Sequence, residues 1–91
     1  MKYSELEFWL KKSAEWVDGY YKRLKNKPVR PTLSPGEFRA LLPNSPPQSS
    51  EPIADIVADF KRLVPDAMTH WQHPRFFAYF PANAAPASIL A

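Results

Sequence analysis

The sequence predicts a mainly α-helical segment with two amphipathic helices, one short helix and proline-rich connectors. Two observations carry this expectation. Apolar residues recur at three- and four-residue steps in two separate stretches, and prolines bound both stretches. The 91 residues include 11 prolines, more than twice the usual share of about 5%. We therefore expect short elements around a thin hydrophobic core.

The first predicted helix runs from about Glu5 to Lys25 and ends before Pro28. Ser4 and Glu7 fit a capping box at its start. Its apolar stripe consists of Leu6, Trp9, Leu10, Trp16, Val17, Tyr20 and Leu24. Because this stripe is wide for so short a chain, we expect it to be buried against another subunit or a further part of the protein.

Residues 26–50 form a proline-rich connector that one short helix interrupts. Ser34 as the N-cap, Pro35 at the first helical position and Glu37 two residues later predict a short helix over Phe38–Leu42. The apolar residues of the connector predict that it lies against a surface, because a free linker is richer in glycine and serine.

A second amphipathic helix follows, with Ser49 or Ser50 as its cap, Pro52 in its first turn and Pro65 at its end. Its apolar face consists of Ile53, Ile56, Val57, Phe60, Leu63 and Val64.

Two carboxylates, Asp55 and Asp59, lie four residues apart on the other face of this helix. They fit a metal or acid–base pair, but the favoured interpretation is a solvated face on which Arg62 pairs with Asp59.

Composition excludes several classes of function. Without cysteine the chain has neither disulfides nor a thiolate metal site, and the expected location is the cytoplasm. No apolar run reaches the roughly 18 to 20 residues of a membrane span. Five of the twelve basic residues lie between Lys22 and Arg30, after Glu5 and Glu7, an order that the helix dipole favours. We therefore expect no nucleic-acid partner.

The sequence also lacks the residues for covalent chemistry of its own. His70 and His73 have an H-x-x-H spacing without a third ligand, so no metal site is predicted. The two glycines, Gly19 and Gly36, cannot form a phosphate loop, and no nucleophile has an evident base beside it.

Residues 69–81 form an aromatic loop that follows neither a helix nor a strand period. Five of its thirteen residues are aromatic: Trp71, Phe76, Phe77, Tyr79 and Phe80. Pro74 and Pro81 oppose regular pairing. The rings either form core under a loop, which base rates favour, or line a pocket that can stack on a planar ring.

Several motifs follow one another in order along the chain: Val29-Arg30-Pro31, Ser34-Pro35-Gly36-Glu37, Leu41-Leu42-Pro43, Pro46-Pro47, Thr69-His70-Trp71, Pro74 and Phe77-Ala78-Tyr79-Phe80-Pro81. In these motifs the chain resembles the group II pyridoxal-phosphate-dependent amino-acid decarboxylases, the family of aromatic-L-amino-acid, tyrosine, tryptophan and histidine decarboxylases. The resemblance covers residues 1–91 and changes the preferred interpretation of the loop to a pocket wall.

The resemblance implies the N-terminal part of an α/β fold-type I enzyme, a homodimer that binds an amino-acid substrate and pyridoxal 5'-phosphate. It places substrate-binding residues at Trp71, Tyr79, Phe80, Pro81 and Ala82. Relatives often have threonine or serine where this chain has Ala82, so no side-chain hydroxyl is available there. The catalytic lysine and the cofactor-binding residues are expected beyond position 91, and the 91 residues alone are expected to be inactive.

We accordingly expect residues 1–81 to form a helical dimerisation segment whose substrate-pocket loop is 69–81. Residues 82–91 are expected to begin the helix leading to the cofactor domain, with Asn83 or Ala84 near its cap and Pro86 in its first turn. A helix that starts so late indicates a fragment of a longer protein. The alternative is a stand-alone helical interaction module that binds a protein partner through the aromatic loop.

Overall fold

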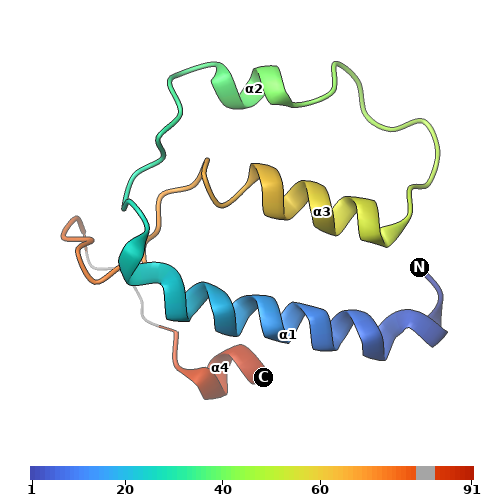
Figure 1. The fold of residues 1–91 in the computed structure, drawn as a ribbon, viewed down its shortest axis with the longest axis horizontal. Coiled ribbons are helices and arrows are strands. Elements are labelled where there is room, and N and C mark those ends of the chain that lie inside the picture. The colour runs from blue at the N-terminus through green and yellow to red at the C-terminus, as the bar shows by residue number, and fades with distance from the viewer. Residues whose placement is uncertain (80–83) are drawn as a thin grey trace.

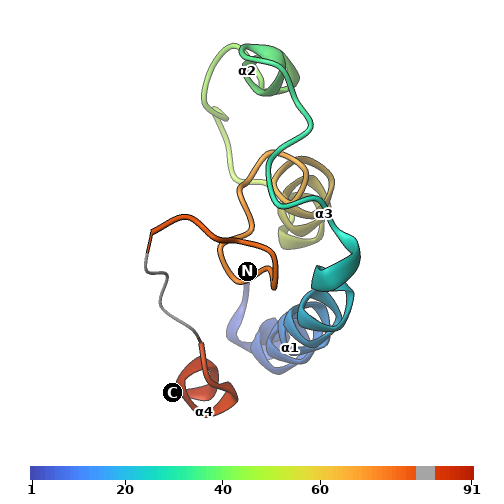
Figure 2. The ribbon, with the colours of Figure 1, turned by 90° about the vertical axis from the view of Figure 1, so that its left-hand side faces the viewer.

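Two helices that run in the same direction, α1 (Leu6–Arg23) and α3 (Ile53–Leu63), form the centre of the computed structural model (Figure 1). The connector between them carries the short helix α2 (Glu37–Leu41), and α4 (Pro86–Leu90) lies on the other side of α1 (Figure 2). The 3-10 turns Tyr3–Glu5 and Leu24–Asn26 flank α1. The structure describes residues 1–79 and 84–91, and within these ranges the prediction of a mainly helical segment is confirmed.

Both long helices form where they were expected, but their predicted caps are wrong. Before α1, the Lys2 backbone N–H donates to the Glu5 carboxylate at 2.7 Å. Ser4 already lies inside the 3-10 turn there, so it cannot cap the helix that follows. For α3 the N-cap is Pro52, whose backbone is not helical (φ −58°, ψ 137°). The serines 49 and 50 therefore lie outside the helix start.

The short helix α2 begins one residue earlier than predicted, and its N-cap is Gly36 rather than Ser34. Gly36 has φ 89°, a left-handed conformation that favours glycine. The Ser34 carbonyl accepts the Glu37 N–H at 3.1 Å, which closes the turn before the helix. Helix α4 begins at Pro86 with Ala85 as its N-cap, next to the predicted Ala84, whereas Asn83 lies outside the described residues.

The packing between α1 and α3 is slight. Among the described large apolar side chains only Leu24 is buried, at 4% exposure. Trp16 of α1 contacts Phe60 of α3 edge to face, with ring centroids 5.2 Å apart. The expectation that the whole α1 stripe packs outside the chain is therefore wrong for its central part. Leu6 and Leu10, at the start of the same helix, stay exposed.

The chain presents more surface than a self-contained domain of its mass. Its accessible surface is 7894 Å², whereas a compact protein of this mass exposes about 5400 Å². The radius of gyration is 15.6 Å, compared with about 12 Å for a compact domain of this length. A standard protein interface buries about 800 Å² on each partner. The excess surface is therefore large enough for a substantial interface.

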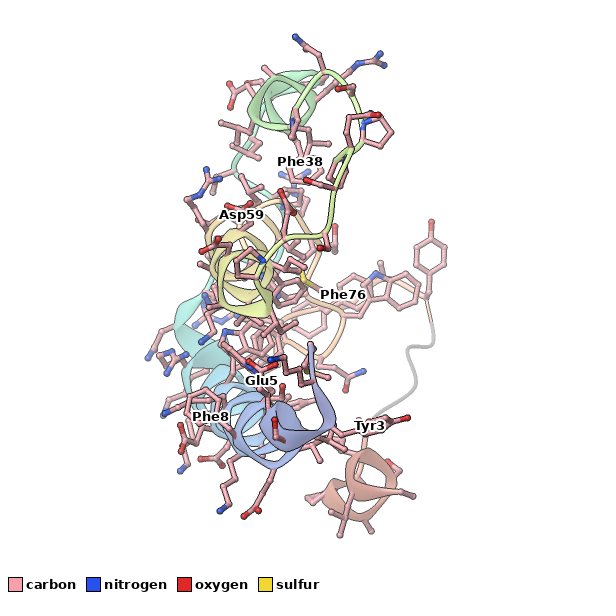
Figure 3. The ribbon with its side chains drawn as sticks, turned by 90° about the vertical axis from the view of Figure 1, so that its right-hand side faces the viewer. Tyr3, Glu5, Phe8, Phe38, Asp59 and Phe76 are labelled. Atoms are coloured by element: carbon pink, nitrogen blue, oxygen red, sulfur yellow. The ribbon has the colours of Figure 1, made fainter. Side chains whose placement is uncertain are left out.

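The polar faces of the helices are solvated as predicted. The Arg62 guanidinium donates to the Asp59 carboxylate at 2.9 Å, and both side chains are largely exposed. In Figure 3, Asp59 lies on the side of α3 away from Phe76. In the part of the chain that the structure describes, no helix is long and apolar enough to cross a membrane.

Candidate functional site

A partly buried hydrogen bond fastens the start of the aromatic loop to α1. The Tyr20 hydroxyl lies 2.7 Å from Nδ1 of His70, whose side chain and backbone together are 3% exposed. The His70 backbone N–H also donates to the Val29 carbonyl at 2.9 Å. The loop is therefore held by α1 and by the connector at the same residue.

Burial sets the direction of this hydrogen bond. Loss of solvation is the main cause of the lowered pKa of His70. A backbone hydrogen bond with Pro65 and the charge of Asp66 oppose this effect, whereas Lys27 and His73 add to it. Loss of solvation, together with the neighbouring Tyr21, raises the pKa of Tyr20. Near neutral pH the imidazole is thus uncharged and the hydroxyl keeps its proton, so Tyr20 donates and His70 Nδ1 accepts.

Ring contacts continue from this hydrogen bond back to α3. Tyr20 stacks on Trp16 with centroids 5.6 Å apart and an interplanar angle of 17°. Trp16 contacts Phe60 in turn, and Tyr20 lies 5.6 Å from the His70 ring. Because such pairs stabilise beyond their buried area, this line of rings positions the loop relative to both central helices.

The loop itself is built from two consecutive turns that share His73. The His73 N–H donates to the His70 carbonyl at 3.1 Å, and the Phe76 N–H donates to the His73 carbonyl at 3.0 Å. Nδ1 of His73 accepts the Arg75 N–H at 2.9 Å. Pro74 has no N–H to satisfy at this point. The loop is thus irregular, as predicted, but ordered by specific hydrogen bonds.

An exposed aromatic cluster follows from these turns. Trp71 stacks on Phe76 (5.2 Å, 22°) and on Tyr79 (6.0 Å, 8°). Within the described residues no ring contact joins Phe76 to Tyr79, so the indole lies between them. Trp71 is 49% exposed and Tyr79 is 81% exposed. The interpretation of these two rings as core is therefore wrong.

Tyr79 has a strained backbone. Among the described residues other than glycine, Tyr79 alone has a positive φ, at 58°. For a bulky side chain such a conformation costs about 1 to 3 kcal/mol. It accompanies the nearly parallel alignment of the Tyr79 ring with Trp71. The Ala84 N–H donates to Gln72 Oε1 at 3.4 Å, so the chain returns toward the turn after the cluster.

The structure thus brings two of the predicted site residues, Trp71 and Tyr79, into one cluster. The other three, Phe80, Pro81 and Ala82, lie outside the described residues. Sequence reasoning missed the role of Tyr20. The available signal was a tyrosine on an apolar stripe, because a buried hydroxyl requires a partner.

The two histidines considered as metal ligands serve the loop instead. Nδ1 of His70 is paired with Tyr20 and Nδ1 of His73 with the Arg75 N–H. In the described ranges no three side chains of the metal-binding types come together.

Two apolar hollows flank α1. One, of about 360 Å³, lies between α1 and α3 and includes Trp9, Val17 and Ile56 in its lining. The other, of about 580 Å³, lies between α1 and α4 and includes Leu10 and Ile89. Among the described residues, no member of the aromatic loop lines either hollow.

The segment matches the family model described as the pyridoxal-dependent decarboxylase conserved domain over residues 35–91. Two curated relatives are similar over most of the chain. An aromatic-L-amino-acid decarboxylase of Manduca sexta is 42% identical over 82 residues, which cover 89% of this chain and 16% of the relative. A tyrosine decarboxylase of Narcissus pseudonarcissus is 37% identical over 79 residues, which cover 87% of this chain and 16% of the relative.

Solved structures agree with the family match. The structure of Oryza sativa TDC with PLP has a TM-score of 0.88 and 32% identity, covering 99% of this chain and 19% of that one. Catharanthus roseus tryptophan decarboxylase in complex with L-tryptophan has a TM-score of 0.86 and 30% identity, with the same coverage. The chain therefore belongs to the pyridoxal-dependent decarboxylase family and has the fold of the N-terminal part of these fold-type I enzymes. It spans about a sixth of the length of the curated relatives.

The lysines are the residues to consider for a site of the family's cofactor, pyridoxal phosphate. A cofactor site of this kind needs a lysine that forms a Schiff base. Six of the seven lysines are exposed, and Lys11, Lys12 and Lys22 are each paired with an acidic residue of α1. No step of cofactor chemistry is therefore assigned to these residues.

Replacing Tyr20 by phenylalanine should loosen the aromatic loop. The substitution keeps the ring contacts but leaves His70 Nδ1 buried without a donor, which we expect to cost about 1 to 2 kcal/mol. Amide hydrogen exchange at residues 70–76 in the full-length protein should accelerate. Tyr21→Phe removes a hydroxyl from the neighbouring tyrosine and is the matched control. Equal exchange in both variants would contradict the role of the Tyr20 bond.

The loop should lose stability in mild acid. Because the folded-state pKa of His70 is lowered, the unfolded chain binds the proton more readily. The contribution is complete above the unfolded value of about 6.5 and is lost as the pH falls toward the folded value. His70→Asn places an oxygen near the position of Nδ1 and does not titrate in this range. Between pH 8 and 5 the melting temperature should depend less on pH in this variant than in the wild-type protein. The same pH dependence in both proteins would refute the role of His70 protonation.

Proposed function

We propose that this chain is the N-terminal segment of a pyridoxal-phosphate-dependent decarboxylase that acts on aromatic L-amino acids. In this proposal it supplies dimer contacts and one wall of the substrate pocket. The observation that carries the proposal is the exposed pair of Trp71 and Tyr79, which lie 8° from parallel. Aromatic surface on an ordered turn fits a planar substrate ring better than it fits water.

The strain at Tyr79 supports a binding role. Strained backbone persists where surrounding contacts over-determine it, and such residues are concentrated at ligand sites. Here the contacts are the stack on Trp71 and the turns that His73 closes. The rings are therefore oriented before any ligand arrives, which reduces the entropic cost of binding.

The proposal extends the wall through Phe80, Pro81 and Ala82, the continuation of the aromatic loop. Ala82 offers no side-chain hydrogen bond. A site without a polar partner discriminates weakly against analogues that differ by a hydroxyl. We therefore propose that selection among hydroxylated and unhydroxylated rings rests on residues beyond this loop.

The dimer contacts are proposed for the exposed apolar residues of α1, among them Leu6, Phe8 and Leu10. The excess surface described above supports this, because it exceeds what one partner buries in a standard interface. We propose a homodimer in which the N-terminal helices of residues 1–81 intertwine and residues 82–91 lead into the cofactor domain.

The substrate class rests on the names of similar proteins. They include the tyrosine and aromatic-L-amino-acid decarboxylases, the tryptophan decarboxylase with L-tryptophan and the TDC structure with PLP and tryptamine. A Petunia hybrida phenylacetaldehyde synthase is also 40% identical over 76 residues. Aldehyde formation is therefore a second candidate reaction. The family match does not favour a stand-alone interaction module, and a cytoplasmic location remains an expectation that cell fractionation would test.

The full-length protein should show the visible absorbance of bound pyridoxal phosphate and release carbon dioxide from an aromatic L-amino acid. Analysis of the organic product separates an amine from an aldehyde, and sedimentation of the same preparation tests the dimer. The 91-residue chain alone is the control and should release no carbon dioxide. If the full-length protein shows no such absorbance and releases no carbon dioxide, the decarboxylase proposal is refuted.

Tyr79→Ala in the full-length enzyme should impair substrate use while the cofactor stays bound. Loss of one aromatic contact, worth about 0.5 to 1.5 kcal/mol, should lower kcat/KM about two- to tenfold, mainly through KM. Tyr3 is 95% exposed and lies in the 3-10 turn before α1, so Tyr3→Ala is the matched control. A parallel loss of cofactor absorbance in Tyr79→Ala would indicate a structural role instead.

A further inference from the structure

The two ring nitrogens of His73 have different surroundings. Nδ1 accepts the Arg75 backbone N–H at 2.9 Å. Nε2 is buried and has no hydrogen-bond partner within the described chain, and the whole residue is only 6% exposed. One end of the ring therefore closes the turn while the other end is sealed from solvent without a partner.

The paired nitrogen determines which end carries the proton. A nitrogen that accepts a backbone N–H has no proton of its own, so a singly protonated ring holds its proton on Nε2. The orphaned atom is thus an N–H donor. Buried donors are nearly always paired in folded proteins, and an unpaired one lowers stability.

His70 in the same turn shows what a satisfied imidazole looks like in this loop. Its Nδ1 is paired with Tyr20, and a backbone hydrogen bond with Pro65 also acts on the ring. His73 Nε2 is the single buried, unpaired side-chain polar atom found in the described residues.

We propose that in the full-length enzyme a small shift of this turn uncovers His73 Nε2–H, which then donates a hydrogen bond to a carbonyl or carboxylate oxygen from another part of the enzyme. His73 lies between Trp71 and Phe76, so this bond positions the aromatic wall relative to the rest of the active site. The inference rests on the proposed function of the loop as a pocket wall. His73 acts as a positioning residue and does not touch the substrate.

Two substitutions separate the ends of the ring. The Oδ1 of His73→Asn lies near the position of Nδ1 and can accept the Arg75 N–H, but this variant has no donor at the Nε2 position. His73→Gln places an amide N–H there but loses the inner acceptor. We expect His73→Asn to raise KM for the aromatic amino acid about three- to tenfold with little change in kcat, and His73→Gln to restore most of this loss. Wild-type KM in His73→Asn together with a raised KM in His73→Gln would overturn the proposal.

A crystal structure of the wild-type holoenzyme tests the contact even if a variant fails to fold. The proposal expects a protein oxygen about 2.7 to 3.2 Å from His73 Nε2. Its position in the structure shows whether the same chain or the second subunit supplies it. Water alone, or no acceptor, at this distance overturns the proposal. Carbon dioxide release by the wild-type enzyme is measured separately, so failure of the inference and failure of the proposed function are distinguishable.

Discussion

The hydrogen bond between Tyr20 and His70 is the contact on which the arrangement of the loop depends. It joins residues 50 positions apart in the sequence and lies at the end of a line of rings that begins on α3. Because residues 71–79 form no helix or strand, this hydrogen bond positions the turns that follow His70. The placement of the exposed aromatic cluster therefore follows from a polar contact in an otherwise thin core.

The thin core of this segment limits the stability that the segment has by itself. Apart from Leu24, the large apolar side chains of residues 1–79 and 84–91 keep a share of exposed surface. A small domain that buries so little gains too little hydrophobic free energy to offset the conformational entropy lost on ordering. The two curated relatives described above are about six times as long as the segment they share with this chain, and we propose that contacts with the rest of such a protein supply what this core lacks.

The loop combines rigid positioning with an exposed outer surface. His73 closes the turn, Trp71 lies between Phe76 and Tyr79, and Tyr79 holds a strained φ. Exposed aromatic rings on an unconstrained loop would turn inward or vary in position. Here hydrogen bonds and stacking keep them outward, which is the condition under which ring surface can serve recognition.

The sequence by itself determined where the helices lie, the Asp59–Arg62 pair and the family motifs, because periodicity, prolines and neighbouring charges act over a few residues. It misjudged the caps at Ser4, Ser34 and Ser49 or Ser50. The N-cap of α2 is instead the glycine, and that of α3 the proline, directly before the helix, and the N-cap of α1 is Glu5. Only the tertiary structure decided the pairing of Tyr20 with His70, the orphaned nitrogen of His73 and the stack of Trp71 on Tyr79. These depend on which distant side chains meet when the loop docks on α1, and no local pattern encodes that geometry.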